Sequence, residues 1–277
     1  MKSIPLPNGE RVPALGQGTW MMGERATSRA DEIASLRMGL DLGLSLIDTA
    51  EMYGDGLAES LIGEALAGRR DEAFLVSKVY PHNASAKGTI AACERSLKRL
   101  CTDRIDLYLL HWPGQIPLAE TLAGFQALRD AGKIRHYGVS NFDCSALQAW
   151  WSLDADPGVA TNQLLYNLTR RGIEWDLLPW MRERRIPVMA YSPIEQARLT
   201  RDRRLIDFAG ELGITPAQAA LAWLLSREDV IAIPKTGRVQ HVRENAAALT
   251  ITLTTGQLAR LDSLFAPPSQ GTPLEML

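Results

Sequence analysis

The sequence predicts one eight-stranded (β/α) barrel with an extra C-terminal helix and an active site at the carboxyl ends of the strands. Short apolar runs alternate with longer amphipathic segments, as expected for buried parallel strands and their connecting helices. A polar or aromatic cluster follows each of eight such runs. The length of 277 residues is close to that of one barrel, about 250 residues, so residues 1–277 are expected to form a single domain.

The eight clusters mark the expected carboxyl ends of the strands. In chain order they occupy residues 16–20, 47–53, 75–80, 109–113, 138–142, 161–163, 189–193 and 231–236. In a (β/α) barrel these ends converge on one face, where enzymes with this fold keep their active sites. Side chains far apart in the sequence are therefore expected to meet.

Amphipathic helices are expected between the strands. Residues 31–43, 91–101 and 118–132 carry apolar side chains at intervals of three and four. Thr215 followed by a proline marks the start of a helix over 215–228. Residues 254–266 come after the last expected strand and predict the extra helix, and the tail from Pro267 is expected to lie over the surface.

Composition excludes several classes of protein. The formal net charge is only −2 and basic residues alternate with acidic ones, so no basic stripe for nucleic acid is present. No segment reads as a signal peptide or as a membrane span of about 18 apolar residues, which predicts a cytoplasmic protein without a membrane partner. The three cysteines show no metal-binding spacing and are interpreted as packing residues. No metal site is expected.

Three successive clusters supply the residues for acid catalysis on a carbonyl group. Tyr53 can donate a proton, but its ordinary pKa near 10 requires a neighbouring cation that stabilises the phenolate. Lys78 can be that cation, and Asp48 on the adjacent strand can keep the buried lysine charged. His111 can donate a hydrogen bond to the carbonyl oxygen and orient it.

Each of these residues has an alternative structural interpretation. Asp48 could cap a helix, Lys78 could be a charge at the barrel rim, and His111 could be a hydrogen-bonded core histidine. Their joint occurrence on three successive strand ends favours a shared catalytic site.

Reduction also requires a hydride donor, and no redox-active side chain or metal-ligand set is evident, so a nicotinamide cofactor is expected. Ser140, Asn141 and Gln163 suit a carboxamide, and Tyr191 offers a face for the nicotinamide ring. The GxGxxG fingerprint is absent, which argues against a Rossmann domain. A phosphate site is expected in the last barrel unit, where these residues favour NADPH: Lys235, Thr236, Arg238, His241 and Asn245.

Over nearly its full length the chain resembles the aldo-keto reductases, particularly bacterial members that reduce methylglyoxal and other small aldehydes. The resemblance is carried, in order, by LGQGTW, LSLIDTAEMYGDGLAESLIGEAL, FLVSKVYP, DRIDLYLLHWP, GKIRHYGVSNF, ATNQLLYN, VMAYSP and VIAIPKT. It implies that Tyr53 is the general acid, that Lys78 and Asp48 lower its pKa, and that His111 orients the carbonyl.

The resemblance also implies the cofactor site. The loop 192–199 would cover the pyrophosphate, and Lys235, Thr236 and Arg238 would contact the adenosine 2′-phosphate. Many members carry an arginine where this chain has His241, which leaves NADH as an alternative cofactor. The full expected cofactor-binding set is Gly18, Thr19, Trp20, Asp48, Ser140, Asn141, Gln163, Tyr191, Ser192, Pro193, Ile194, Gln196, Lys235, Thr236, Arg238, His241 and Asn245.

The expected substrate is a small carbonyl compound. A short segment after the fourth strand and a short tail predict an open pocket, with Trp20, Tyr80, Trp112 and His111 around the carbonyl. A bulkier ketone or a sugar is an alternative substrate, and a nicotinamide-binding regulatory subunit, like the potassium-channel β-subunits that share this barrel, is an alternative of another class. The family implies a monomer.

Overall fold

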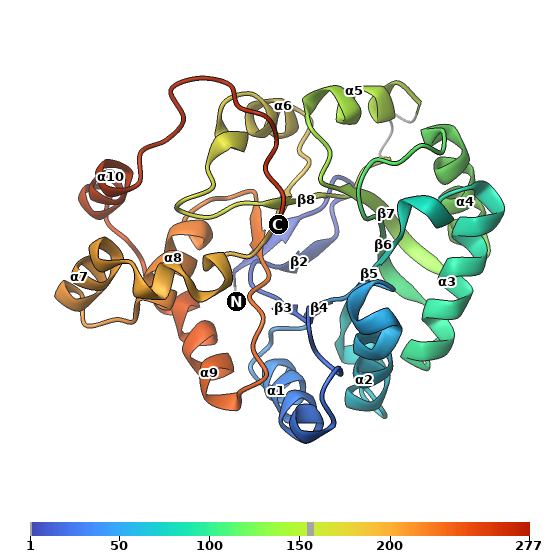
Figure 1. The fold of residues 1–277 in the computed structure, drawn as a ribbon, viewed down its shortest axis with the longest axis horizontal. Helices are drawn as coiled ribbons and strands as arrows, with labels where there is room; N and C mark the ends of the chain where they lie inside the picture. Colours follow the sequence, from blue (N-terminus) through green and yellow to red (C-terminus); the bar gives the residue numbers. More distant parts are fainter. Residues whose placement is uncertain (1, 154–157) are drawn as a thin grey trace.

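Eight parallel strands form the predicted (β/α) barrel in the computed structural model, which describes residues 2–153 and 158–277 (Figure 1). Neighbouring strands pair in chain order. Two parallel bridges, Leu15 with Ala232 and Gly18 with Lys235, join the first strand to the last and close the barrel. The strands are β3 (Gln17–Gly18), β4 (Leu46–Asp48), β5 (Phe74–Val79), β6 (Ile105–Leu110), β7 (Ile134–Ser140), β8 (Asn162–Leu165), β9 (Val188–Tyr191) and β10 (Val230–Ala232).

Helices surround the strands (Figure 1). Those that complete the strand–helix repeats are α1 (Arg29–Asp41), α2 (Leu57–Ala65), α3 (Ala86–Leu100), α4 (Leu118–Asp130), α5 (Cys144–Leu153), α6 (Leu177–Glu183), α8 (Pro216–Leu225) and α9 (Val239–Ala247). Short 3₁₀ turns lie at Ala26–Ser28, Tyr53–Gly56, Arg70–Glu72, Pro81–Asn83, Gly172–Glu174, Glu195–Ala197, Leu199–Arg201 and Ala248–Thr250. The polar loops that carry the predicted site therefore extend from a buried scaffold.

Two helices in the described ranges lie outside these repeats. The predicted extra helix is α10 (Thr255–Leu264), whose start is fixed by a reciprocal capping box between Thr254 and Gln257. A second one, α7 (Arg203–Glu211), was not predicted. It begins where the Asp202 side chain accepts a hydrogen bond from the Arg204 backbone amide, and it buries Leu205 and Phe208. Ala209 is buried as well, so the buried side chains have the i, i+3, i+4 spacing of an amphipathic helix, and the sequence carried a signal for this helix that was overlooked.

Capping explains where two other helices begin. Thr215 and Gln218 form the capping box of α8, as the Thr-Pro signal predicted. Helix α3 starts earlier than the expected residue 91, because the Ser85 side chain accepts a hydrogen bond from the Gly88 amide. At the other end of α3, Cys101 has a left-handed φ of 51° and is exposed, so the interpretation of all three cysteines as packing residues was wrong for this one.

An antiparallel hairpin, β1 (Ser3–Pro5) and β2 (Arg11–Pro13), precedes the barrel and was not predicted. Its turn places the Glu10 carboxylate 2.7 Å from both Arg135 and His136, in the first residues of β7. The hairpin therefore covers the amino end of the strands and leaves the carboxyl end free for a site. No helix in the described ranges is long and apolar enough to cross a membrane.

The tail after α10 does not simply lie over the surface as predicted. It runs across the face of the barrel to the centre of the view in Figure 1. Leu274 packs against the core, and Met276 and Leu277 line the cavity at the barrel mouth. Its position depends on contacts with segments far away in the sequence, which local patterns do not reveal.

Candidate active site

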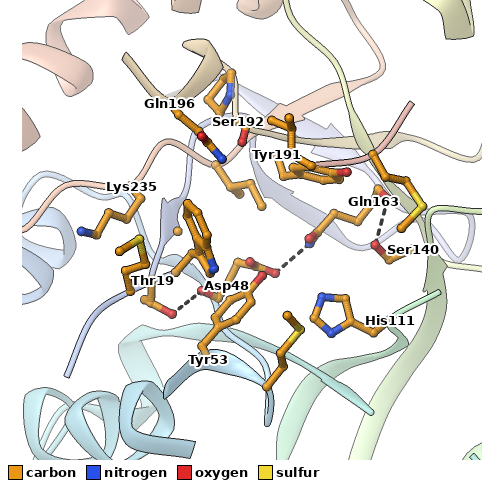
Figure 2. A pocket seen from close by; sticks show the side chains of 18 of the residues that line it. Thr19, Asp48, Tyr53, His111, Ser140, Gln163, Tyr191, Ser192, Gln196 and Lys235 are labelled. Atoms are coloured by element: carbon orange, nitrogen blue, oxygen red, sulfur yellow. Dashed lines mark hydrogen bonds between the residues drawn. The ribbon is translucent and has the colours of Figure 1, made fainter. Parts of the chain in front are cut away.

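A cavity of about 420 Å³ opens at the carboxyl ends of the strands and collects most of the predicted site residues (Figure 2). Its walls come from β8, from the carboxyl ends of β3, β4, β7 and β9 with the loops after them, from the loops after β6 and β10, and from the chain's last residues. They comprise Gly18, Thr19, Trp20, Met21, Asp48, Met52, Tyr53, His111, Trp112, Ser140, Asn141, Gln163, Tyr191, Ser192, Pro193, Ile194, Gln196, Ala197, Ile233, Lys235, Met276 and Leu277.

Lys78 lies directly behind this cavity and is fully buried. Its Nζ donates hydrogen bonds to Asp48 Oδ2 at 2.9 Å, to the Thr49 carbonyl at 2.8 Å and to the Tyr53 hydroxyl oxygen at 3.1 Å. An ammonium group has three N–H donors, so all of them are used. Burial alone would lower the pKa of Lys78, but Asp48 and Tyr53 raise it above its ordinary value, which keeps the ammonium charged.

Asp48 connects Lys78 to the cofactor side of the site. One of its carboxylate oxygens accepts the Lys78 hydrogen bond, and the other accepts a hydrogen bond of 2.7 Å from Gln163 Nε2. Burial raises the pKa of Asp48, against the opposing effect of Lys78. The backbone carbonyl of Asp48 also receives the Thr19 hydroxyl at 2.9 Å, which ties the ends of β3 and β4 together. Figure 2 shows the hydrogen bonds that Asp48 receives from Gln163 and Thr19.

Tyr53 begins a tight 3₁₀ turn after β4, in which Gly54 and Asp55 take left-handed φ values of 57° and 54°. The turn directs the phenol back over the barrel toward Lys78. Burial raises the pKa of Tyr53, and the charge of Lys78 opposes that rise. The predicted effect of Lys78 thus has the expected sign, but burial outweighs it in the structure as described.

His111, at the end of β6, lies beside Tyr53 with ring centroids 5.9 Å apart. Burial, reinforced by the charge of Lys78, lowers its pKa to about 2. The imidazole is therefore neutral at neutral pH, and its one N–H can still act as the predicted hydrogen-bond donor. Asn141 donates to the His111 backbone carbonyl at 3.1 Å and helps fix the strand end that carries the ring.

Polar side chains after β7 and β8 form the side of the cavity predicted to bind a carboxamide. The Tyr191 hydroxyl donates to Asn141 Oδ1 at 3.0 Å, and the Ser140 hydroxyl donates to the Gln163 carbonyl at 3.0 Å. Gln163 Oε1 accepts no hydrogen bond from the described part of the chain. An acceptor of this kind beside the Tyr191 ring fits the amide of a nicotinamide.

The loop after β9 forms the adjoining wall. Ser192, Glu195, Gln196 and Ala197 have left-handed φ values of 47°, 50°, 52° and 67°. Side chains with a Cβ rarely adopt this conformation, so contacts outside the loop must hold it. Glu195 makes such contacts. It is buried and accepts hydrogen bonds from Asn167 and Arg170 in the loop after β8. Sequence analysis did not identify either partner.

The residues predicted to bind the 2′-phosphate lie at the other end of the site, where the chain enters α9. Lys235 lines the cavity, whereas Thr236, Arg238, His241 and Asn245 do not. The Thr236 hydroxyl accepts a hydrogen bond of 3.2 Å from the Arg238 amide and lies 3.5 Å from His241 Nδ1. Lys235, Arg238 and His241 are exposed, and Asn245 is buried.

The predicted substrate pocket is only partly reproduced. Trp20, Trp112 and His111 line the cavity, but Tyr80 is not among the lining residues and instead packs edge-on against Trp112, with centroids 5.8 Å apart. Tyr80 was expected in the pocket because it directly follows β5. Its place after a strand does not determine the direction of its side chain. Sequence analysis missed the lining residues Met21, Met52, Ile233, Met276 and Leu277, and it included Ala197 only as part of the loop 192–199. Met21 and Met52 lie next to or inside clusters already identified.

Comparisons with known proteins identify the family. The chain matches the Aldo/keto reductase family model over residues 14–266. It is 50% identical to methylglyoxal reductase YeaE of Escherichia coli (strain K12) over 281 positions, which cover 100% of this chain and 99% of that protein. It is 31% identical to the glyoxal reductase of Bacillus subtilis (strain 168) over 272 positions, with coverages of 95% and 92%.

A solved structure is similar throughout. The aldo/keto reductase from Klebsiella pneumoniae, crystallised in complex with NADP and acetate, has a TM-score of 0.97 and 49% identity to this chain, and the match covers 100% of this chain and 99% of that one. The chain belongs to the aldo/keto reductase family of oxidoreductases.

Proposed function

We propose that this protein reduces small aldehydes such as methylglyoxal to alcohols with NADPH, and that Tyr53 donates the proton. The observation that carries the proposal is the hydrogen bond from Lys78 Nζ to the Tyr53 hydroxyl oxygen, 3.1 Å long, at the wall of the cavity. Because Lys78 is the donor, the hydroxyl hydrogen of Tyr53 remains free to reach a carbonyl oxygen in the cavity.

The same contact supports proton transfer. A phenolate that forms at Tyr53 gains a full charge interaction with the Lys78 ammonium, and the buried surroundings strengthen that interaction. Neutral His111 supplies a second hydrogen bond that positions the carbonyl oxygen beside the phenol. Asp48 keeps Lys78 charged and in place, without contacting the carbonyl itself.

The cofactor supplies the hydride when it is bound. We assign the carboxamide to Ser140, Asn141 and Gln163, the nicotinamide face to Tyr191, and the 2′-phosphate to Lys235, Thr236 and Arg238. The Gln163 amide, the Tyr191 ring beside it and the exposed cations near α9 support this assignment. The names of the relatives in E. coli and B. subtilis support small dicarbonyl substrates.

The test is an assay of the purified protein with methylglyoxal, in which loss of reduced-nicotinamide absorbance is followed with NADPH and NADH in parallel. We expect faster oxidation of NADPH. Faster use of NADH would contradict the assignment of Lys235 and Arg238, and no consumption of either cofactor would contradict the small-aldehyde function. Activity on a bulkier ketone or a sugar alone would change the substrate class while keeping the family chemistry.

We also propose that residues 1–277 act as one domain and as a cytoplasmic monomer. The uninterrupted strand order around the barrel supports a single domain. A mass near 30.5 kDa in light scattering would agree with a monomer, and a single cooperative unfolding transition would agree with one domain. A larger mass or two separate transitions would contradict them.

A further inference from the structure

One arginine contacts two segments that wall the cavity from different parts of the chain. We name residues 192–197 the cofactor loop and residues 272–277 the strap. Arg170 Nη2 and Nε donate to Glu195 Oε1 in the cofactor loop at 2.9 and 3.1 Å. Arg170 Nη1 donates to Glu275 in the strap. The two carboxylates therefore share one guanidinium group.

The backbone of Arg170 is held in place by contacts other than these ion pairs. Asn167 and Arg170 pair through their backbones in a tight turn, with Arg170 N 3.0 Å from the Asn167 carbonyl. The Asn167 side chain, fully buried, donates to Glu195 Oε2 at 2.8 Å and to the Ser192 carbonyl at 2.9 Å. The turn is thus a rigid base from which the cofactor loop is held.

The cofactor loop depends on this base. Four of its residues have left-handed φ values, which are unfavourable for side chains with a Cβ. Burial would raise the pKa of Glu195, but hydrogen bonds from Arg170 and Asn167 hold it below its ordinary value, so the anchoring carboxylate is charged at neutral pH. Weaker anchoring should let the loop relax toward ordinary backbone conformations.

The strap lies against the same cavity. Met276 and Leu277 line it together with Ser192, Pro193 and Ile194 of the cofactor loop. Tyr191 and Leu277 both line the cavity. Burial raises the pKa of Tyr191 to about 12, and the Leu277 backbone opposes that rise. Glu275 is the strap residue that reaches back to Arg170.

We propose that Arg170 is a positioning residue that couples the strap to the cofactor loop, so that these two walls of the cavity are ordered together. The inference rests on the proposed function, which makes residues 192–197 a cofactor-binding segment. Glu275 is outside the predicted cofactor set and pairs with Arg170, and its removal should affect the cofactor loop through Arg170.

The test uses Glu275→Gln in the full-length protein. Glu64→Gln is the matched control, because Glu64 forms an exposed ion pair with Arg29 outside the cavity, with 54% of its side chain exposed against 41% for Glu275. Without any ligand, hydrogen exchange of the amides in residues 192–198 should be about two- to fivefold faster in Glu275→Gln, the range expected from loss of one exposed ion pair. Exchange there should not change in Glu64→Gln.

A double-mutant cycle identifies the route of the coupling. In an Arg170→Met background, Glu275→Gln should add no further increase in exchange. With cofactor, Glu275→Gln should raise the Kd for NADPH about two- to fivefold and raise the KM for methylglyoxal, while kcat at saturation stays within about twofold. Glu275→Asp should restore part of the affinity.

The coupling would be overturned if residues 192–198 exchanged at the same rate in Glu275→Gln as in the Glu64→Gln control. It would also be overturned if Glu275→Gln increased exchange equally in the wild-type and Arg170→Met backgrounds. Failure of the wild-type protein to bind NADPH would instead overturn the proposed function. The exchange measurement on unliganded protein still decides the coupling in that case.

Discussion

The two ends of the cavity are built on opposite physical principles. At one end, the proton cluster consists of the buried Asp48 and Lys78 and the half-buried Tyr53, and Lys78 has every donor paired. At the other end, the phosphate end of Lys235, Thr236, Arg238 and His241 exposes its basic side chains to solvent. A buried, fully bonded group is positioned before substrate arrives, whereas exposed cations can adjust to a phosphate and are screened by salt.

Replacement of Lys78 by methionine should have the largest effect. It leaves the Asp48 carboxylate buried without its cation, which typically costs about 3–5 kcal/mol of unfolding free energy, and it removes the partner of Tyr53. Urea unfolding and turnover measurements would detect both losses. Lys235→Met is the control at the phosphate end, where stability should change by less than about 0.5 kcal/mol. Equal stability losses would refute the contrast.

Tyr53→Phe should separate chemistry from stability within the proton cluster. Turnover with methylglyoxal should fall by about 10² to 10⁴, the usual contribution of general acid catalysis, because the proton donor is absent. NADPH binding, followed by fluorescence titration, should remain close to wild type. Turnover near the wild-type level would rule out Tyr53 as the acid.

The lowered pKa of His111 predicts that the stability of the protein depends on pH. Its pKa is about 2 in the folded protein and about 6.5 in an unfolded chain, so below pH 6.5 the unfolded state binds the extra proton. Stability should therefore fall as the pH decreases, by about 2 kcal/mol from pH 7 to pH 5 for this group. The decrease should be smaller by that amount in His111→Gln, measured by urea unfolding at both pH values. An unchanged decrease would show that His111 is not buried in its neutral form.

The smallest of these effects is expected at the phosphate end. Lys235→Ala should raise the Kd for NADPH about tenfold and leave the Kd for NADH nearly unchanged, because the lost charge would contact only the additional phosphate. Added salt should weaken NADPH binding to the wild type more than to the variant. Equal effects on both cofactors would assign Lys235 to another part of the dinucleotide.

The contrast between the two ends also explains what could be predicted from the sequence. The barrel and the meeting of Asp48, Tyr53, Lys78 and His111 followed from strand ends, because barrel topology brings such ends together. The position of the chain's last residues could not be predicted in this way. It depends on Arg170 and Glu275, whose contact spans 105 residues and leaves no local pattern.

Two smaller features were also missed. Helix α7 is short, and the helical spacing of its buried Leu205, Phe208 and Ala209 was present in the sequence but was not recognised as a separate helix. Tyr80 follows a strand as expected, but the direction of its side chain is set by packing against Trp112 and His82. The position of a residue along a strand could be predicted from the sequence. The direction of its side chain and its long-range contacts could be seen only in the three-dimensional structure.

The seam between β3 and β10 has a consequence for how the protein is made. It is closed by backbone hydrogen bonds from Gly16 to Ala232 and from Gly18 to Pro234, and a Cβ on Gly18 would lie 2.8 Å from the Ile233 carbonyl. During synthesis the first strand leaves the ribosome long before its partner, so its edge stays unpaired until nearly the whole chain has emerged. A ribosome that stalls before residue 230 would release a chain with an open sheet edge, which is a template for aggregation.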